Sequence, residues 1–284
     1  MSWLGWLVRA THPLPALAVT AFVTGTCLAA GVGARSGLVA AAVLAGQASV
    51  GWSNDWIDAG RDATAGRREK PTVHGVVTAR QLRAAALGAA VACVPLSFAL
   101  GVRAGVVHLT AVGAAWAYNA GLKATVLSFL PYLIAFGLVP PVFVAALLPG
   151  ADPRPALVIA GGLLGVAAHF VNTVPDEAAD ALTAVRGLPQ RLGPTRSVLG
   201  CTAMVIGASV LLAVGGGTGA AAGGVAAVAL AVTAALAVRA GERSRLSFRL
   251  VIAAVAALVI GVVASGDRMV ARPRHLSGAA QHTQ

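Results

Sequence analysis

The sequence predicts an all-α integral membrane protein with nine transmembrane helices. Hydrophobic residues make up 57% of the 284-residue chain and charged residues 11%, whereas soluble domains contain about 25% charged residues. The mean hydropathy is +0.80. This composition excludes a soluble globular protein. It also excludes a disordered chain, which has few apolar and many charged residues.

The nine helices are counted from the gaps between charged residues, because a helix needs roughly 17–25 apolar residues to cross the bilayer core. Seven gaps each accommodate one helix: 10–34, 36–54, 84–102, 104–122, 124–151, 155–175 and 250–266. The gap 197–238 holds 42 residues, enough for two helices, and the glycines of 215–219 divide it near its middle.

The spans are rich in Ala and Gly, which let helix backbones approach closely within a membrane. They lack the alternation of polar and apolar residues that is typical of membrane β-strands. Pro131, Pro140 and Pro141 predict a kink in the fifth helix. Residues 1–266 are therefore expected to form a single transmembrane domain, and 267–284 a polar, mobile tail.

The distribution of basic residues predicts the orientation. With the N-terminus in the cytoplasm, the segments on that side carry 15 of the 21 Lys and Arg residues. This bias fits the positive-inside rule for multi-pass proteins of the cell membrane. It also accounts for the net charge of +11 without a nucleic-acid partner.

Seven of the ten acidic residues fall in two clusters, where the second and sixth spans end. The first cluster is Asp55, Asp58, Asp62 and Glu69, and the second is Asp176, Glu177 and Asp180. The two spans run in the same direction, so both clusters are expected on one face of the membrane. The charge distribution makes that face cytoplasmic.

Helical geometry also places the side chains of each cluster on one face of its helix. The three aspartates of the first cluster point within about 60° of one another on a helix, and Asn172, Asp176 and Asp180 within about 80°. Like charges on one face repel, so a cation is expected between them. Oxygen ligands without nearby His or Cys favour Mg²⁺, bound together with substrate phosphates. The alternative is that these are solvated helix-end carboxylates paired with Arg61, Arg67, Arg68 and Arg186.

Residues 54–62 have the pattern NDxxDxxxD, which resembles the first aspartate-rich motif of the UbiA superfamily of intramembrane prenyltransferases. The following 67–71, RREKP, and Gly75 are similar to that family's R-x-R-P…G loop, with Lys70 where Arg is commoner. Arg9, His12 and Pro13 resemble the R-x-x-x-P start of its first helix.

The second acidic cluster carries the resemblance further. Residues 176–180 form a DxxxD motif, and 186–193, RGLPQRLG, are similar to the family's G-x-x-T-L-P-x-R-L-G ending without the Thr. Tyr118 and Lys123 match the tyrosine and lysine often found at the end of its fourth helix. In helix count, order and motif placement, the resemblance covers about residues 9–265.

The resemblance implies a ring of nine helices around a central cavity beneath a cytoplasmic cap, with two Mg²⁺ ions holding an isoprenyl diphosphate. The candidate metal ligands are Asp55, Asp58, Asp62, Asp176 and Asp180. The candidate diphosphate-binding residues are Asn54, Arg67, Arg68, Lys70, Lys123, Asn172 and Arg186. The candidate catalytic residues are the five aspartates with Lys123 and Tyr118.

The expected reaction transfers an isoprenyl group from its diphosphate to a small aromatic or other lipophilic acceptor within the lipid bilayer. Carboxylates alone would repel a diphosphate, whereas Mg²⁺ bridging the two turns repulsion into attraction and stabilises the leaving group. The resulting allylic carbocation must be shielded from water. Two alternatives remain: a terpene cyclase of the same fold that needs no second substrate, and a transporter or non-catalytic binding protein that never releases pyrophosphate.

Overall fold

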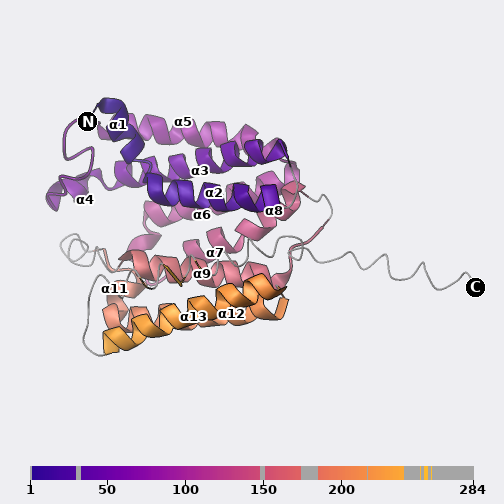
Figure 1. Cartoon of the computed structure of the whole chain (residues 1–284). Helices are drawn as coiled ribbons and strands as arrows, with labels where there is room; N and C mark the ends of the chain where they lie inside the picture. The colour runs from indigo at the N-terminus through magenta and orange to yellow at the C-terminus, as the bar shows by residue number, and fades with distance from the viewer. Residues whose placement is uncertain are drawn as a thin grey trace, which may run out of the picture.

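In a computed structural model, the chain is described over residues 2–29, 33–147, 151–173, 185–215, 217–239, 250, 253, 254 and 257. Within these ranges the backbone forms helices that lie side by side in one bundle (Figure 1). In chain order they are α1 Trp3–Arg9, α2 Pro13–Ala29, α3 Arg35–Ile57, α4 Ala59–Thr64, α5 Ala79–Phe98, α6 Val102–Ala120, η1 Leu122–Ala124, α7 Leu130–Gly137, α8 Val139–Leu147, α9 Pro155–Thr173, α11 Leu188–Leu192, α12 Pro194–Gly215 and α13 Gly217–Arg239.

The long helices occupy the expected spans. Helices α2, α3, α5, α6, α9, α12 and α13 each fall on one of them, and α7 and α8 share the fifth. The expected division of 197–238 is confirmed, because α12 ends at Gly215 and α13 begins at Gly217. The expected ninth span lies outside the described residues except for 250, 253, 254 and 257, and the expected tail lies wholly outside them.

Length and composition mark out some of these helices as able to cross a bilayer. Among the described residues, α5 and α12 combine at least 18 residues with sufficient apolar character. Shorter apolar stretches occur in α2, in α7 with α8, in α9 and in α13.

The fifth span is interrupted at Leu138, between α7 and α8. Pro140 and Pro141 fall in the first turn of α8, and neither can donate a backbone hydrogen bond to the end of α7. Pro131 lies in the first turn of α7, a position where helices tolerate proline. The predicted kink at Pro131 is therefore wrong, since this residue marks the beginning of a helix.

Packing connects the helices in a continuous series. Helix α3 packs against α2, α5 and α6, and α6 packs in turn against α7 and α8. Helix α9 packs against α7 and α12, and α12 against α13. At Gly161 and Gly165 an added Cβ would lie 2.7 Å from the Phe136 carbonyl oxygen and 2.4 Å from that of Tyr132. These glycines let α9 approach the backbone of α7, as small residues do between membrane helices.

Several segments that carry candidate site residues meet at one end of the bundle. Figure 1 shows α4 and α11 at this end. Helix α3 ends here, because Asp58 contacts Lys123 of η1. Helix α9 ends here as well, because His169 and the backbone of Leu188 both contact Ser128. The prediction that the second and sixth spans end on the same side is confirmed.

Candidate active site

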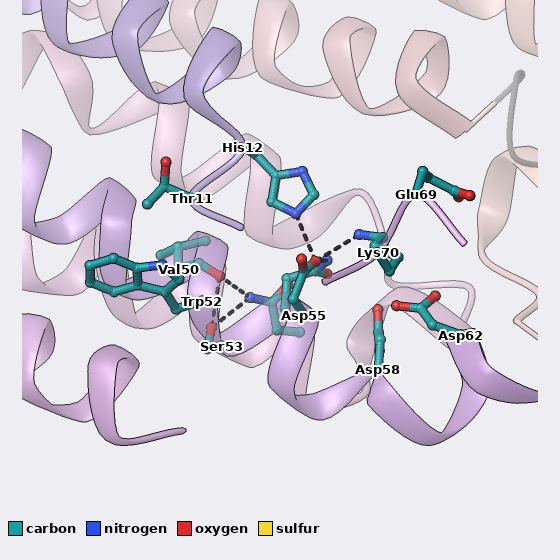
Figure 2. A network of polar contacts seen from close by, with 12 residues as sticks. Thr11, His12, Val50, Trp52, Ser53, Asp55, Asp58, Asp62, Glu69 and Lys70 are labelled. Carbon is teal, nitrogen blue, oxygen red and sulfur yellow. Dashed lines mark hydrogen bonds and ion pairs between the residues drawn. The ribbon is translucent and has the colours of Figure 1, made fainter. Parts of the chain in front are cut away.

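The first aspartate motif extends from the last turn of α3 into α4. Asp58 links the two helices in helical backbone conformation, with φ −84° and ψ −4°. Its N–H donates to the Asn54 carbonyl at 2.9 Å, and its own carbonyl accepts from the Asp62 N–H at 2.8 Å. The turns therefore continue through the junction. Figure 2 shows the carboxylates of Asp58 and Asp62 turned towards each other.

Burial distinguishes these carboxylates from ordinary helix-end acids. Asp55 is 1% exposed and Asp62 is 4% exposed. Ionised carboxylates are strongly stabilised by water, so burial requires compensating partners. Asp55 and Asp62 are therefore not the solvated carboxylates that the alternative interpretation expects, whereas Glu69 is exposed.

Lys70 and His12 provide the partners of Asp55. The Lys70 Nζ lies 2.7 Å from Asp55 Oδ1, and His12 Nε2 lies 2.9 Å from the same oxygen. The side chain of Lys70 is itself buried. The loop that follows α4 thus returns a lysine to the end of α3, as Figure 2 shows.

Lys123 provides the main partner of Asp58. Its Nζ donates to Asp58 Oδ1 at 2.7 Å and Oδ2 at 2.5 Å, and lies 3.4 Å from Asn54 Oδ1. Gly121, with φ 151°, separates α6 from the 3-10 turn that carries this lysine. Arg61 also pairs with Asp58, from the solvent side. A buried lysine, 7% exposed, is therefore fixed beside the motif.

Asp62 is less completely compensated. Within the described chain, its buried Oδ2 atom has no hydrogen-bond partner, and Arg67 Nη1 lies 3.7 Å from Oδ1. Burial raises the pKa of the Asp62 carboxyl above its ordinary value of 3.8, although Lys70 and Arg67 oppose the shift. An unpartnered buried carboxylate oxygen is a favourable position for a cation.

The loop between α4 and α5 contains two left-handed glycines and contacts α1. Gly66 and Gly75 have φ 64° and 79°, in the left-handed region that glycine enters without steric cost. The Trp6 ring of α1 lies 4.6 Å from the His74 ring, measured between centroids. Arg67 donates to Glu69 at 2.8 Å, which lowers the pKa of that exposed carboxyl.

A cluster of rings lies between α6, α7 and α9. The Tyr118 ring packs edge-on against Tyr132 and His169, with centroids 5.1 and 5.5 Å apart. The Tyr132 and His169 rings stack at 4.8 Å. His169 Nε2 lies 2.9 Å from Ser128 Oγ, which also accepts the Leu188 N–H at 2.9 Å. Ser128 thus connects α9 to the start of α11, the segment that follows the second motif.

The structure brings only some of the other predicted site residues to the first aspartate cluster. Arg68 and Arg186 are exposed. Asn172 belongs to the last turn of α9, and the structure describes its backbone alone. Asp176 and Asp180 lie outside the described residues. The structure therefore assembles the first half of the predicted site, with Asn54, Arg67, Lys70 and Lys123 beside the first three aspartates.

Three residues that contribute to the candidate site were not predicted from the sequence. His12 was noticed as part of a motif without a role, whereas its side chain contacts Asp55. Ser128 and Tyr132 carry no sequence signal of their own, because a serine and a tyrosine near a helix start are common. Asn119 Nδ2 donates to Val50 O at 2.9 Å and Ser53 Oγ at 2.8 Å, and so joins α6 to α3.

The fold and this arrangement define a membrane-embedded helical enzyme with buried carboxylates and lysines at one end of its bundle. The chain belongs to the UbiA prenyltransferase family, whose sequence profile matches residues 17–252. It is accordingly an intramembrane prenyltransferase, as its aspartate motifs predicted. Among curated protein sequences, none matches this chain.

Solved structures share the fold at low sequence identity. A UbiA homologue from Archaeoglobus fulgidus, bound to GPP and Mg²⁺, aligns with a TM-score of 0.67 at 16% identity, over 91% of this chain and 99% of that one. The apo UbiA homologue from Aeropyrum pernix K1 aligns with a TM-score of 0.69 at 19% identity, over 87% and 97%. A digeranylgeranylglyceryl phosphate synthase aligns with a TM-score of 0.68 at 17% identity, over 93% and 100%.

Proposed function

We propose that this prenyltransferase moves an isoprenyl group from an isoprenyl diphosphate to a small aromatic acceptor in an Mg²⁺-dependent reaction. The observation that carries the proposal is the pairing of buried Asp55 and half-buried Asp58 with the buried Lys70 and Lys123, beside the buried Oδ2 of Asp62, which has no hydrogen-bond partner among the described residues. Acidic and basic groups held together at one end of an apolar bundle suit a substrate with an anionic head and an apolar tail.

The residues fit Mg²⁺, which prefers oxygen ligands and shares its coordination with substrate phosphates. Among the described residues, no three His, Cys, Asp or Glu side chains converge on one ion. We infer that two ions are held jointly by the first motif, by Asp176 and Asp180, and by the diphosphate. Two structures of a UbiA homologue from Archaeoglobus fulgidus contain GPP or DMAPP together with Mg²⁺, which supports the use of Mg²⁺.

The cationic side chains have a direct part in ionisation of the substrate. When the bond between the allylic carbon and oxygen breaks, its electron pair leaves with the diphosphate, and bound Mg²⁺ would help to neutralise that charge. Lys70, Lys123 and Arg67 are placed to stabilise the departing anion, as preorganised charges do in a site of low dielectric. Asn54, with Oδ1 3.4 Å from Lys123 Nζ, helps to position that lysine.

The allylic cation is then consumed by the acceptor. An electron-rich ring carbon of the acceptor attacks the cation and forms a C–C bond, and loss of the ring proton restores aromaticity. The rings of Tyr118, Tyr132 and His169 support this proposal, because aromatic faces stabilise nearby cations without reacting as strong bases. The proton acceptor is either a second-motif aspartate or the released diphosphate.

We further propose that the protein is a multi-pass protein of the cell membrane with the site on the cytoplasmic face. The excess of Lys and Arg in the segments on the proposed cytoplasmic side, 15 of 21 residues, supports this orientation.

The test is mass spectrometry of the products that purified enzyme forms from isoprenyl diphosphates of increasing chain length, crossed with a panel of aromatic and polar acceptors. Prenylated aromatic product with release of pyrophosphate supports the proposal. A cyclic hydrocarbon formed without any acceptor would instead identify a terpene cyclase. Prenylation of polar lipid acceptors alone would show that the aromatic assignment is wrong.

A further inference from the structure

The turn between α1 and α2 contains an unusual backbone conformation at His12. Among the described non-glycine residues, only His12 has a positive φ, of 54°. Left-handed conformations cost a non-glycine residue roughly 1–2 kcal/mol. The turn is fixed by hydrogen bonds from His12 N to Arg9 O at 3.1 Å and from Ala16 N to His12 O at 3.2 Å. Glycine would satisfy this backbone at lower cost, so the histidine side chain requires its own explanation.

The same turn is pressed against α3 one helical turn before the first aspartate. A Cβ added at Gly51 would lie 2.5 Å from the Thr11 carbonyl oxygen, so only glycine permits this contact. Trp52 Nε1 donates to Leu7 O at 2.9 Å and fixes α1 to the same helix. Residue 55 follows residue 51 by one turn on the same face. The approach of Thr11 to Gly51 therefore brings His12 next to Asp55.

Donors converge on a single oxygen of the Asp55 carboxylate. His12 Nε2 lies 2.9 Å from Oδ1, Lys70 Nζ 2.7 Å and Asn54 Nδ2 3.4 Å. Each contact made to this carboxylate within the described chain involves Oδ1. An ionised carboxylate only accepts hydrogen bonds, so Nε2 must carry the imidazole proton. Among these described contacts, none involves the second oxygen, Oδ2.

We propose that His12 is a positioning residue that orients Asp55 for metal binding, by holding Oδ1 so that Oδ2 is presented to Mg²⁺. This role rests on the proposed function, in which Asp55 is a metal ligand. Hydrogen bonds from outer groups fix the orientation of metal-binding carboxylates, and their removal typically costs about 10–100-fold in metal affinity or activity. The left-handed turn directs the imidazole of His12 towards Asp55, which lies 43 positions later in the chain.

The test compares His12→Gly, His12→Asn and His12→Gln by the Mg²⁺ concentration that gives half-maximal rate at saturating diphosphate. Gly and Asn both suit a left-handed turn, but neither carries a donor as far as Nε2. We expect both to raise the required Mg²⁺ concentration about 10-fold or more. Gln, whose amide nitrogen reaches further, restores much of the difference. Thr11→Ala is the matched control, because within the described part of the chain the Thr11 hydroxyl bonds only Val8 O, at 2.7 Å.

The outcomes separate positioning from a purely structural turn. If His12→Gly folds and keeps the wild-type Mg²⁺ requirement, the histidine is only a turn residue and the proposal is wrong. If His12→Gly does not fold, His12→Asn gives the same comparison. A Gln variant no better than Gly also contradicts the proposal. Failure of the proposed function itself is distinguishable, because the wild-type enzyme would then show no Mg²⁺-dependent consumption of diphosphate.

Discussion

Lys123, in the turn after α6, donates to both carboxylate oxygens of Asp58, which lies 65 residues earlier at the end of α3. The pair joins two helices through charged groups with low exposure. Each partner is costly to bury alone, because an unpaired charge loses its hydration without compensation. The contact therefore fixes the end of α6 relative to the first aspartate motif.

Replacement of Lys123 by Met should reduce turnover by about 10²-fold, the scale of losing one preorganised electrostatic contact. Met keeps the length and apolar stem of the side chain, so the loss reflects the missing ammonium. Turnover is measured by pyrophosphate release under saturating diphosphate and Mg²⁺. Arg61→Ala is the matched control, since Arg61 pairs with the same Asp58 from a more exposed position, and we expect a few-fold change. Equal effects of the two substitutions would show that Lys123 acts only as a counter-ion.

A second prediction concerns Ser128, which is fully buried and contacts both His169 and the Leu188 N–H. Ser128→Ala removes a partner from the buried His169 and from the half-buried Leu188 N–H, and an unpaired buried polar group costs about 1–3 kcal/mol. The apparent melting temperature in detergent should therefore fall clearly. Thr110→Ala serves as control, because the exposed Thr110 hydroxyl bonds only within its own helix, to Val106 O. An unchanged melting temperature for Ser128→Ala would indicate that the connection between α9 and α11 contributes nothing to stability.

Much of the fold followed from charge-free gaps, because a bilayer imposes a minimum length on each apolar helix. The gaps located α2, α3, α5, α6, α9, α12 and α13. They misplaced the ends, since the first turns outside the apolar core are governed by local capping and by contacts. Helix α3 continues to Ile57, beyond the charge-free gap that ends at 54, and the chain from 121 to 129 forms a short 3-10 turn and a loop where the gap from 124 onward was expected to be helical.

The candidate site was predictable to the extent that its residues are close in sequence. Asp55, Asp58 and Asp62 were gathered by helical spacing alone. Their partners were harder to find, because Lys70, Lys123 and His12 arrive from three other segments. The motif resemblance supplied both lysines. The resemblance included His12 but indicated no role for it, since that role depends on a left-handed turn and on the close approach of Thr11 to Gly51.

Removal of divalent metal ions should abolish activity. Dialysis against EDTA is expected to eliminate product formation, and Mg²⁺ or Mn²⁺ should restore it, because carboxylate oxygens bind hard cations. Zn²⁺ is the comparison, as it favours nitrogen and sulfur ligands and should restore less. Product formation is followed by mass spectrometry. Full activity in a preparation shown to be metal-free would rule out the proposed ionisation mechanism.

The orientation of the site is tested by a cysteine placed in α4. Thr64 is exposed, whereas Cys27, Cys93 and Cys201 are all buried. These three cysteines are replaced first, so that any labelling reports on the introduced cysteine. Thr64→Cys should react with a membrane-impermeant thiol reagent in inverted vesicles or lysed cells and stay unlabelled in intact cells. Labelling of intact cells would invert the topology and contradict the positive-inside assignment.

The last prediction addresses the second motif, which lies outside the described residues. On a helix, Asp176 and Asp180 differ in direction by about 40°, so both can face one bound ion, whereas Glu177 is turned by about 100° from Asp176. Asp176→Ala and Asp180→Ala should each reduce turnover by about 10²-fold or more. Glu177→Ala is the internal control and should cost a few-fold, as exposed charge pairs contribute only about 0–1 kcal/mol.

All three of these variants should still fold in detergent, because removing one carboxylate from a crowded cluster relieves repulsion between like charges. Size-exclusion chromatography and thermal unfolding check this before turnover is compared. Mild and equal losses at the three positions would indicate solvated carboxylates at a helix end, and the second half of the proposed site would then have to be sought elsewhere. A dominant loss at Glu177 would show that the helical phase assigned to this segment is wrong, because the residue facing the ion would be the one predicted to turn away from it.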